Sequence, residues 1–145
     1  MRGKTALTIA RLAFAATVLI ASGRAASAAT CDRACLLEHA RQFNANMLAR
    51  TTGKIPLAPA ARIRENTAAI ALADSRWLSV KRILSQGVFA DPVKGNVVEH
   101  VAAETEAGKT VYVGTRLKVE GGKITEVEIN FDDRPNVNAR NLVPY

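Results

Sequence analysis

The chain has 145 residues, and its 20 Lys and Arg against 13 Asp and Glu give a formal net charge of +7. Four of the basic residues and no acid lie in residues 1–29, so the remaining 145 − 29 = 116 residues carry only 16 − 13 = +3. This modest charge, with no basic stripe interleaved with aromatics, argues against a nucleic-acid partner. A segment of this length suffices for one small domain with a single core.

Residues 1–29 have the pattern of a signal peptide. Arg2 and Lys4 precede an apolar run from Leu12 to Ala21, and Ala26-Ser27-Ala28 follows as a cleavage site. Ten uninterrupted residues are well short of the roughly 20 that a membrane span needs. We therefore predict export to the periplasm or the extracellular space, with no membrane contact once the leader is removed. The domain is expected over 30–135, with a loosely held tail at 136–145.

Two cysteines, Cys31 and Cys35, remain after cleavage. An even pair in an oxidising compartment predicts a disulfide, here a local clasp that closes a very short loop. The spacing does not fit a thioredoxin-type Cys-x-x-Cys site. We predict no metal site, because the other candidate ligands lack motif spacing: Asp32, Glu38, His39 and His100.

The first element expected in the mature chain is a long amphipathic helix. Asp32 can cap it, and Thr51-Thr52-Gly53 is expected to stop it. Its apolar side chains recur at helical spacing, which predicts one buried face: Leu36, Ala40, Phe43 and Met47, widened by Leu37 and Leu48.

A loop containing Pro56 and Pro59 is expected over 54–60, followed by a strand over 61–66. Alternation in that strand places Glu65 on the same side as Ile63. Residues 67–86 have no clear periodicity. Phe89 to Asn96 is typical of a strand end and a turn that leads into a sheet.

From Val97 to Phe131 the sequence predicts three antiparallel strands. Both connecting turns, 106–108 and 120–122, end in Gly, which suits a three-residue loop with a bulge. This register pairs Glu99 with Thr115 and Leu117 with Thr125, and it rejects a two-residue Gly121-Gly122 turn that would mix the faces. The inner face is then apolar except for Glu99, Thr115 and Thr125.

The pattern predicts an α+β fold in which a long N-terminal helix packs on a strongly curved, mainly antiparallel sheet. Several segments resemble the exported, SnoaL-like branch of the nuclear transport factor 2-like superfamily: Cys31-Asp32-Arg33-Ala34-Cys35-Leu36, Pro56-Leu57-Ala58-Pro59, Arg64-Glu65-Asn66, Trp77, 89–92, 116–120 and 124–126. The resemblance implies a cone whose helices cover the concave face of the sheet and leave a pocket. In some members that pocket works as an isomerase, cyclase, dehydratase or epoxide hydrolase.

Some residues of this chain match segments of the family, and others differ from them. Glu65 and Asn66 match a Thr-Glu-Asn-Gly segment of the family, and Trp77 matches a Gly-Leu-Trp segment, so the pocket is expected between them. Arg64 and Thr67 replace the Thr and the Gly of the first segment, and Ser75-Arg76 replace the Gly-Leu of the second.

Two acids are the candidate catalytic residues, because an apolar surround raises a carboxyl pKa toward neutrality. Glu65 ranks first as the reactive group and Glu99 second. The alternative for each is a structural role, for Glu65 as a carboxylate paired with Arg62, Arg64 or a backbone donor. The candidate ligand-binding residues are Asn66, Trp77, Thr115 and His39. No motif for a nucleophilic triad or a phosphate loop is present.

These residues lead to two hypotheses. The first is a pocket for a small, largely apolar molecule, with cofactor-free proton transfer of the isomerase, dehydratase or lyase type. The second is a non-catalytic domain that binds a ligand or a protein, with a homodimer through the outer face of the sheet as one form. A third reading is a truncated relative whose pocket has filled in.

Overall fold

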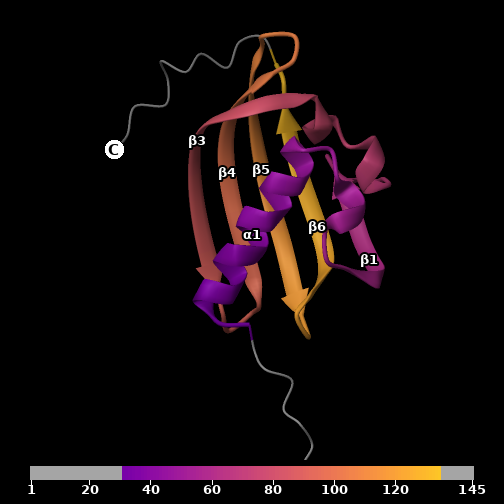
Figure 1. The fold of residues 1–145 in the computed structure, drawn as a ribbon, viewed down its shortest axis with the longest axis vertical. Helices are drawn as coiled ribbons and strands as arrows, with labels where there is room; N and C mark the ends of the chain where they lie inside the picture. The colour runs from indigo at the N-terminus through magenta and orange to yellow at the C-terminus, as the bar shows by residue number, and fades with distance from the viewer. Residues whose placement is uncertain (1–30, 135–145) are drawn as a thin grey trace, which may run out of the picture.

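The computed structural model describes residues 31–134. The predicted leader, its cleavage site and the tail after residue 134 lie outside this range. Within it, one helix packs across one face of a six-stranded sheet whose order is β2-β1-β6-β5-β4-β3 (Figure 1). The predicted α+β fold with a helix on a curved, mainly antiparallel sheet is confirmed.

Helix α1 spans Arg33–Leu48. The Asp32 carboxylate accepts a hydrogen bond from the Cys35 backbone N–H at 2.8 Å, so the predicted N-cap is confirmed. The helix ends earlier than expected, because Ala49 is its C-cap and Arg50 has a left-handed backbone with φ of 56°. Its buried face carries the predicted apolar side chains and one polar side chain that the sequence analysis did not single out: Leu36, Ala40, Phe43, Met47 and Asn44.

Strand β1 spans Leu57–Glu65 and pairs in parallel with β6, Lys123–Asp132. The strand begins earlier than predicted, at Leu57, and it includes Pro59, which the prediction placed in a loop. A register irregularity between Leu57 and Arg62 accommodates the proline, which has no N–H to give to a ladder. Ile63 and Glu65 share the less exposed side of the strand, as the alternation predicted.

The segment without a clear period contains short elements and the start of the longest strand. A two-residue strand β2, Ala68–Ala69, pairs with the end of β1, and two 3₁₀ turns follow, η2 at Leu72–Asp74 and η3 at Arg76–Ser79. A further 3₁₀ turn, η1, covers Thr52–Lys54. Strand β3 then runs from Val80 to Asp91 along the edge of the sheet. Its end at Asp91 confirms the predicted turn.

Strands β4, Asn96–Thr105, and β5, Thr110–Glu120, pair in the predicted register. Val101 lies opposite Val113, and Glu99 lies opposite Thr115. Gly108 has a φ of 73°, as the third position of the predicted bulged loop requires.

The predicted register between β5 and β6 is wrong. Gly121 and Gly122 both have positive φ, 56° and 72°, so a two-residue turn joins the strands and Glu120 pairs with Lys123. A register shift next to Val119 then places Leu117 opposite Val127 instead of Thr125. From Val127 to Phe131 the pairing differs from the prediction by two residues, so these side chains keep their predicted inner face. At the start of β6 the prediction of Thr125 on the inner face is wrong, because the shift puts Ile124 opposite Val119 and buries it in the core.

The inner face of the sheet and α1 enclose the core (Figure 1). Its residues alternate along β4, β5 and β6 with less buried ones that point to the other face. No helix in the described range is long and apolar enough to cross a membrane.

Candidate functional site

Glu99 is the most deeply buried acid of the described chain, with 1% of its surface exposed. One of its oxygens, Oε2, accepts hydrogen bonds from Asn44 Nδ2 of α1 at 2.7 Å and from Gln86 Nε2 of β3 at 2.9 Å. The other, Oε1, has no hydrogen-bond partner among the described residues. Three elements therefore position this carboxyl group, and one half of it is left without a partner.

Burial raises the pKa of Glu99 from 4.5 to about 7, and the hydrogen bonds from Asn44 and Gln86 oppose this rise. Removing a carboxylate from water disfavours its charged form, and two amide donors compensate only in part. A group with a pKa near neutrality exists in both protonation states under ordinary conditions. That is the property a general acid or base requires.

Other polar atoms in the same interior have no partner within the part of the chain that the structure describes. Thr115 is 1% exposed and faces Glu99 across the β4–β5 ladder, and its Oγ1 makes no hydrogen bond there. The same holds for Asn44 Oδ1 and Trp77 Nε1, which are also buried. Buried polar groups in native proteins are nearly always paired. Glu99 therefore lies in a core that contains several polar atoms without a partner among the described residues.

Gln86 connects this interior with the surface. The residue is exposed because β3 is an edge strand, and its side-chain amide nevertheless reaches Glu99.

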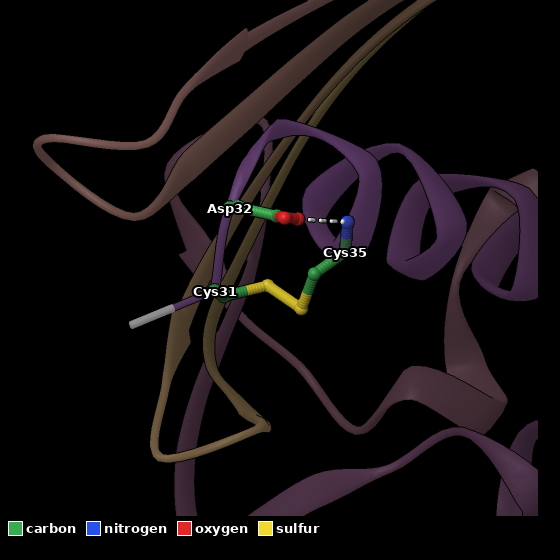
Figure 2. Close-up of a disulfide and its surroundings, with 3 residues drawn as sticks. All are labelled: Cys31, Asp32 and Cys35. Atoms are coloured by element: carbon green, nitrogen blue, oxygen red, sulfur yellow. Dashed lines mark hydrogen bonds between the residues drawn. A yellow bond between two sulfur atoms is a disulfide. The ribbon is translucent and has the colours of Figure 1, made fainter. Parts of the chain in front are cut away.

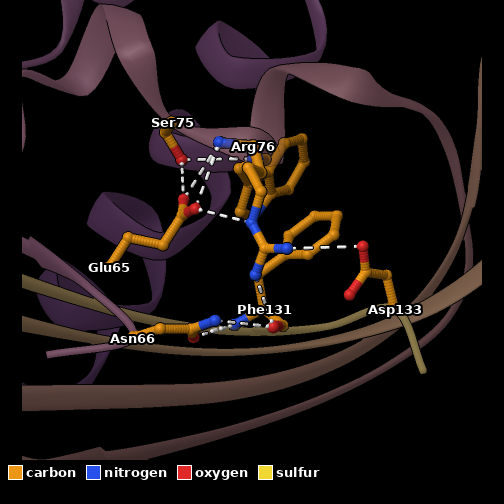
Figure 3. Close-up of polar contacts among 7 residues, drawn as sticks. Glu65, Asn66, Ser75, Arg76, Phe131 and Asp133 are labelled. Atoms are coloured by element: carbon orange, nitrogen blue, oxygen red, sulfur yellow. Dashed lines mark hydrogen bonds and ion pairs between the residues drawn. The ribbon is translucent and has the colours of Figure 1, made fainter. Parts of the chain in front are cut away.

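Glu65 is buried, as predicted, but both of its oxygens are in use (Figure 3). Its Oε2 accepts from Ser75 Oγ at 2.5 Å and from the Arg76 backbone N–H at 3.0 Å, and its Oε1 pairs with Arg76 Nε at 3.1 Å. These contacts hold η3 against the end of β1. They favour the structural alternative of the sequence analysis, with Arg76 as the cation in place of Arg62 or Arg64.

Asn66 also makes structural contacts. Its Nδ2 donates to the carbonyl of Phe131 at 3.0 Å, and its Oδ1 accepts from the Phe131 N–H at 2.8 Å (Figure 3). The side-chain amide thus continues the β1–β6 ladder past the end of β1. The Arg76 guanidinium lies over the ring of the same Phe131, 4.7 Å from the ring centroid.

The predicted ligand-binding residues therefore lie in three places, with His39 near the disulfide at the start of α1. Thr115 and Trp77 lie with Glu99 in the core, and Trp77 is fully buried. Asn66 lies with Glu65 at the end of β1. The sequence analysis missed Asn44 and Gln86, and the signal for Asn44 is its place four residues after Ala40 on the buried stripe of α1.

The disulfide between Cys31 and Cys35 is present at the start of α1 (Figure 2). His39 lies one further turn along the helix, and the ligand atoms of the three residues all lie within 4.8 Å of one another. From the sequence we predicted no metal site, because His39 and the other candidate ligands beside the cysteines lack the spacing of a known motif. The i, i+4, i+8 spacing is the signal that would have found the group.

The outer face of the sheet has a hollow of about 550 Å³. It is mainly apolar and is lined by residues of β3 to β6, among them His100, Ala102, Tyr112 and Gly114. A second hollow, of about 490 Å³, lies beside Asn66 and Arg76 and is lined mostly by polar residues.

Comparisons with known proteins show which fold this is. No model of a known protein family and no curated protein matches the chain. Solved structures do match. A de novo designed protein with a curved β-sheet has a TM-score of 0.56 at 17% identity, over 70% of this chain and 88% of that one.

Two natural proteins give similar matches. A proposed hydroxylase from Streptomyces galilaeus has a TM-score of 0.52 at 16% identity, over 72% of this chain and 93% of that one. A proposed isomerase from Bacillus subtilis has a TM-score of 0.51 at 12% identity, over 67% and 86%. These matches establish the fold. At such identities they carry no residue roles, and fold alone does not fix function.

Proposed function

We propose that this chain is an exported member of the SnoaL-like branch of the nuclear transport factor 2-like superfamily that binds a small, largely apolar molecule against the inner sheet face. The segment resemblances and the curved-sheet fold support the family. The leader and the local disulfide support export.

The observation that carries the functional proposal is Glu99 Oε1, a buried carboxyl oxygen without a partner in the described chain, on a group whose pKa is about 7. A carbonyl or hydroxyl group of the bound molecule would complete the hydrogen bonds of this oxygen and of Thr115 Oγ1. The rest of the molecule would lie against the apolar side chains of β4 and β5. The sequence analysis put Glu65 first, and the contacts of Glu65 move the proposal to Glu99.

The reaction that this arrangement supports is cofactor-free proton transfer. Protonated Glu99 donates its proton to an oxygen of the substrate, or ionised Glu99 removes a proton from a carbon next to a carbonyl. Asn44 and Gln86 hold the carboxyl group in position in both states. The corresponding reaction classes are isomerisation, dehydration and related lyase steps.

Native mass spectrometry of the purified protein, followed by identification of any co-purifying molecule, supplies the ligand for the test. Glu99→Gln keeps the shape of the side chain and removes its ability to exchange a proton. An enzyme loses turnover in this variant and retains binding within a few-fold. Glu106→Gln, an exposed acid in the β4–β5 loop, is the matched control and keeps both. Turnover that survives Glu99→Gln contradicts the catalytic role, and a protein without turnover in any form is a binding domain.

The outer hollow favours a second candidate function, a homodimer through the outer sheet face. A mainly apolar hollow of this size on a face that no described helix covers is the kind of surface that a second copy buries. Sedimentation equilibrium tests it. A dimer that becomes a monomer in Tyr112→Asp, but not in Lys54→Asp, supports this interface, and a wild-type monomer at all concentrations contradicts it.

A further inference from the structure

Cys31, Cys35 and His39 form a compact group of soft and borderline metal ligands at the start of α1. Cys31 precedes the helix, Cys35 lies in its first turn and His39 in its second. One ligand atom from each lies within 4.8 Å of the others. In the oxidised protein the two sulfur atoms are bonded to each other (Figure 2), so no thiolate is available to a metal.

The histidine of this group has a ring nitrogen that the fold does not use. His39 Nδ1 is buried and has no hydrogen-bond partner among residues 31–134. An imidazole nitrogen that makes no hydrogen bond has a lone pair to give to a metal ion. A buried polar atom without a partner in a native fold calls for an explanation.

We propose that Cys31, Cys35 and His39 form a Cu(I) site that opens when the disulfide is reduced. Two thiolates and one imidazole would then surround a single ion. The Cα atoms of the two cysteines, 5.3 Å apart, already hold the sulfur atoms close enough to share it. This site lies outside the Glu99 interior, and it rests on the proposed function only for export to a compartment that holds a dithiol reductant.

The reductant is a dithiol, such as a reduced thioredoxin-fold protein of the exported compartment. One of its thiolates attacks a sulfur of the Cys31–Cys35 bond, which breaks as a mixed disulfide forms. Its second thiol then displaces the remaining cysteine. The dithiol leaves as a disulfide, having lost two electrons and two protons, and the protein gains two thiols. Cu(I) replaces the two S–H protons and takes a lone pair from His39.

The donor set favours Cu(I) over Zn²⁺. Soft thiolates bind both ions, but three ligands complete a trigonal site for monovalent copper. Structural Zn²⁺ sites take four protein ligands. One candidate for a fourth, the Asp32 carboxylate, accepts the hydrogen bond from the Cys35 N–H that caps α1 (Figure 2). Binding Zn²⁺ through Asp32 would therefore disturb the start of the helix.

The test compares the oxidised protein with protein reduced by a phosphine that is then removed under anaerobic conditions. Each is titrated with Cu(I) in competition with the chromogenic chelator bicinchoninate. Reduced protein is expected to take one Cu(I) per chain, and oxidised protein none at the same chelator concentration. X-ray absorption at the copper edge is expected to show two sulfur ligands and one nitrogen ligand.

Variants test the role of each ligand. His39→Ala is expected to weaken Cu(I) binding at least tenfold, whereas His100→Ala, on the outer sheet face, leaves it unchanged. His39→Gln serves as the variant if the alanine form does not fold, as judged by circular dichroism of the oxidised protein. Equal copper uptake by both redox forms, no uptake by the reduced form, or wild-type affinity in the His39 variant overturns the proposal. A reduced protein that takes Zn²⁺ in preference to Cu(I) overturns the choice of metal.

Discussion

Glu99 and Thr115 lie directly opposite each other in the β4–β5 ladder, and each has a buried oxygen without a hydrogen-bond partner in the described range. Cross-strand neighbours of this kind have their Cβ atoms about 5 Å apart. The pair therefore gives the inner sheet face one polar position within an apolar surface. What Glu99 does there can be measured through its effect on stability.

Glu99 should make the stability of the protein depend on pH. Its pKa in the folded protein is about 7, above the ordinary 4.5, so the folded state binds this proton more tightly than the unfolded state. The contribution of Glu99 to the free energy of unfolding is therefore largest below pH 4.5 and falls as the pH rises from 4.5 to about 7. The full difference is about 3 kcal/mol.

Urea unfolding across this pH range and up to slightly alkaline pH measures the dependence. Glu99→Gln is expected to flatten it and to be more stable than the wild type at the alkaline end. Glu106→Gln keeps the wild-type slope. An unchanged slope in Glu99→Gln shows that another group is responsible.

Asn44→Ala should raise the pKa of Glu99 further, because it removes a hydrogen bond that lowers this pKa. It also leaves Glu99 with one donor fewer in the core, which is expected to lower the free energy of unfolding at neutral pH by about 1–3 kcal/mol. Carboxyl-carbon NMR titration of Glu99 measures the first effect and urea unfolding the second. Asn130→Ala, on the exposed face, is the control. A Glu99 pKa at or below the wild-type value in Asn44→Ala would refute this account.

Glu65→Gln should destabilise the protein by about 1–3 kcal/mol, because the charge-assisted contacts with Ser75 and Arg76 are replaced by weaker ones. This loss of stability is expected to lower the midpoint of thermal unfolding and to speed amide hydrogen exchange at the end of β1. Glu104→Gln, which breaks a more exposed pair with Arg82, is expected to cost less than about 1 kcal/mol. Equal losses of stability in the two variants would mean that the contacts of Glu65 do not hold η3 against the end of β1.

Gly95→Ala should be strongly destabilising. Gly95 has a φ of 64°, and a Cβ at this position would lie 2.6 Å from the Val119 carbonyl oxygen. The backbone would have to move and would weaken the 2.8 Å hydrogen bond from Val119 N–H to the Gly95 carbonyl. A loss of about 2 kcal/mol or more is expected in urea unfolding.

The control for this glycine is Gly53→Ala. A methyl group at Gly53 would meet no atom of the described chain within 4 Å, and the φ of Gly53 is not positive. This variant is expected to keep the wild-type stability to within about 1 kcal/mol. A loss as large as that of Gly95→Ala would count against the steric explanation.

Local patterns predicted several parts of this fold because they depend on neighbours in sequence. The cap at Asp32, the buried stripe of α1 and the β4–β5 register all follow from helical or alternating periodicity. The β5–β6 register was wrong for a related reason. A shift of two residues leaves Val127, Ile129 and Phe131 on the same face, so alternation there cannot distinguish the two registers. The glycine turn and the irregularity next to Val119 together decide between them.

Alternation along the chain was enough to put an acid, Glu99, on the buried face of a curved sheet. What surrounds this acid became known only from the folded chain, because Asn44 and Gln86 come from a helix and an edge strand that periodicity cannot bring together. The same is true of Glu65, whose partner Arg76 lies in a segment without a clear period. Contacts between distant segments depend on the packing of the whole core, and no local pattern contains that information.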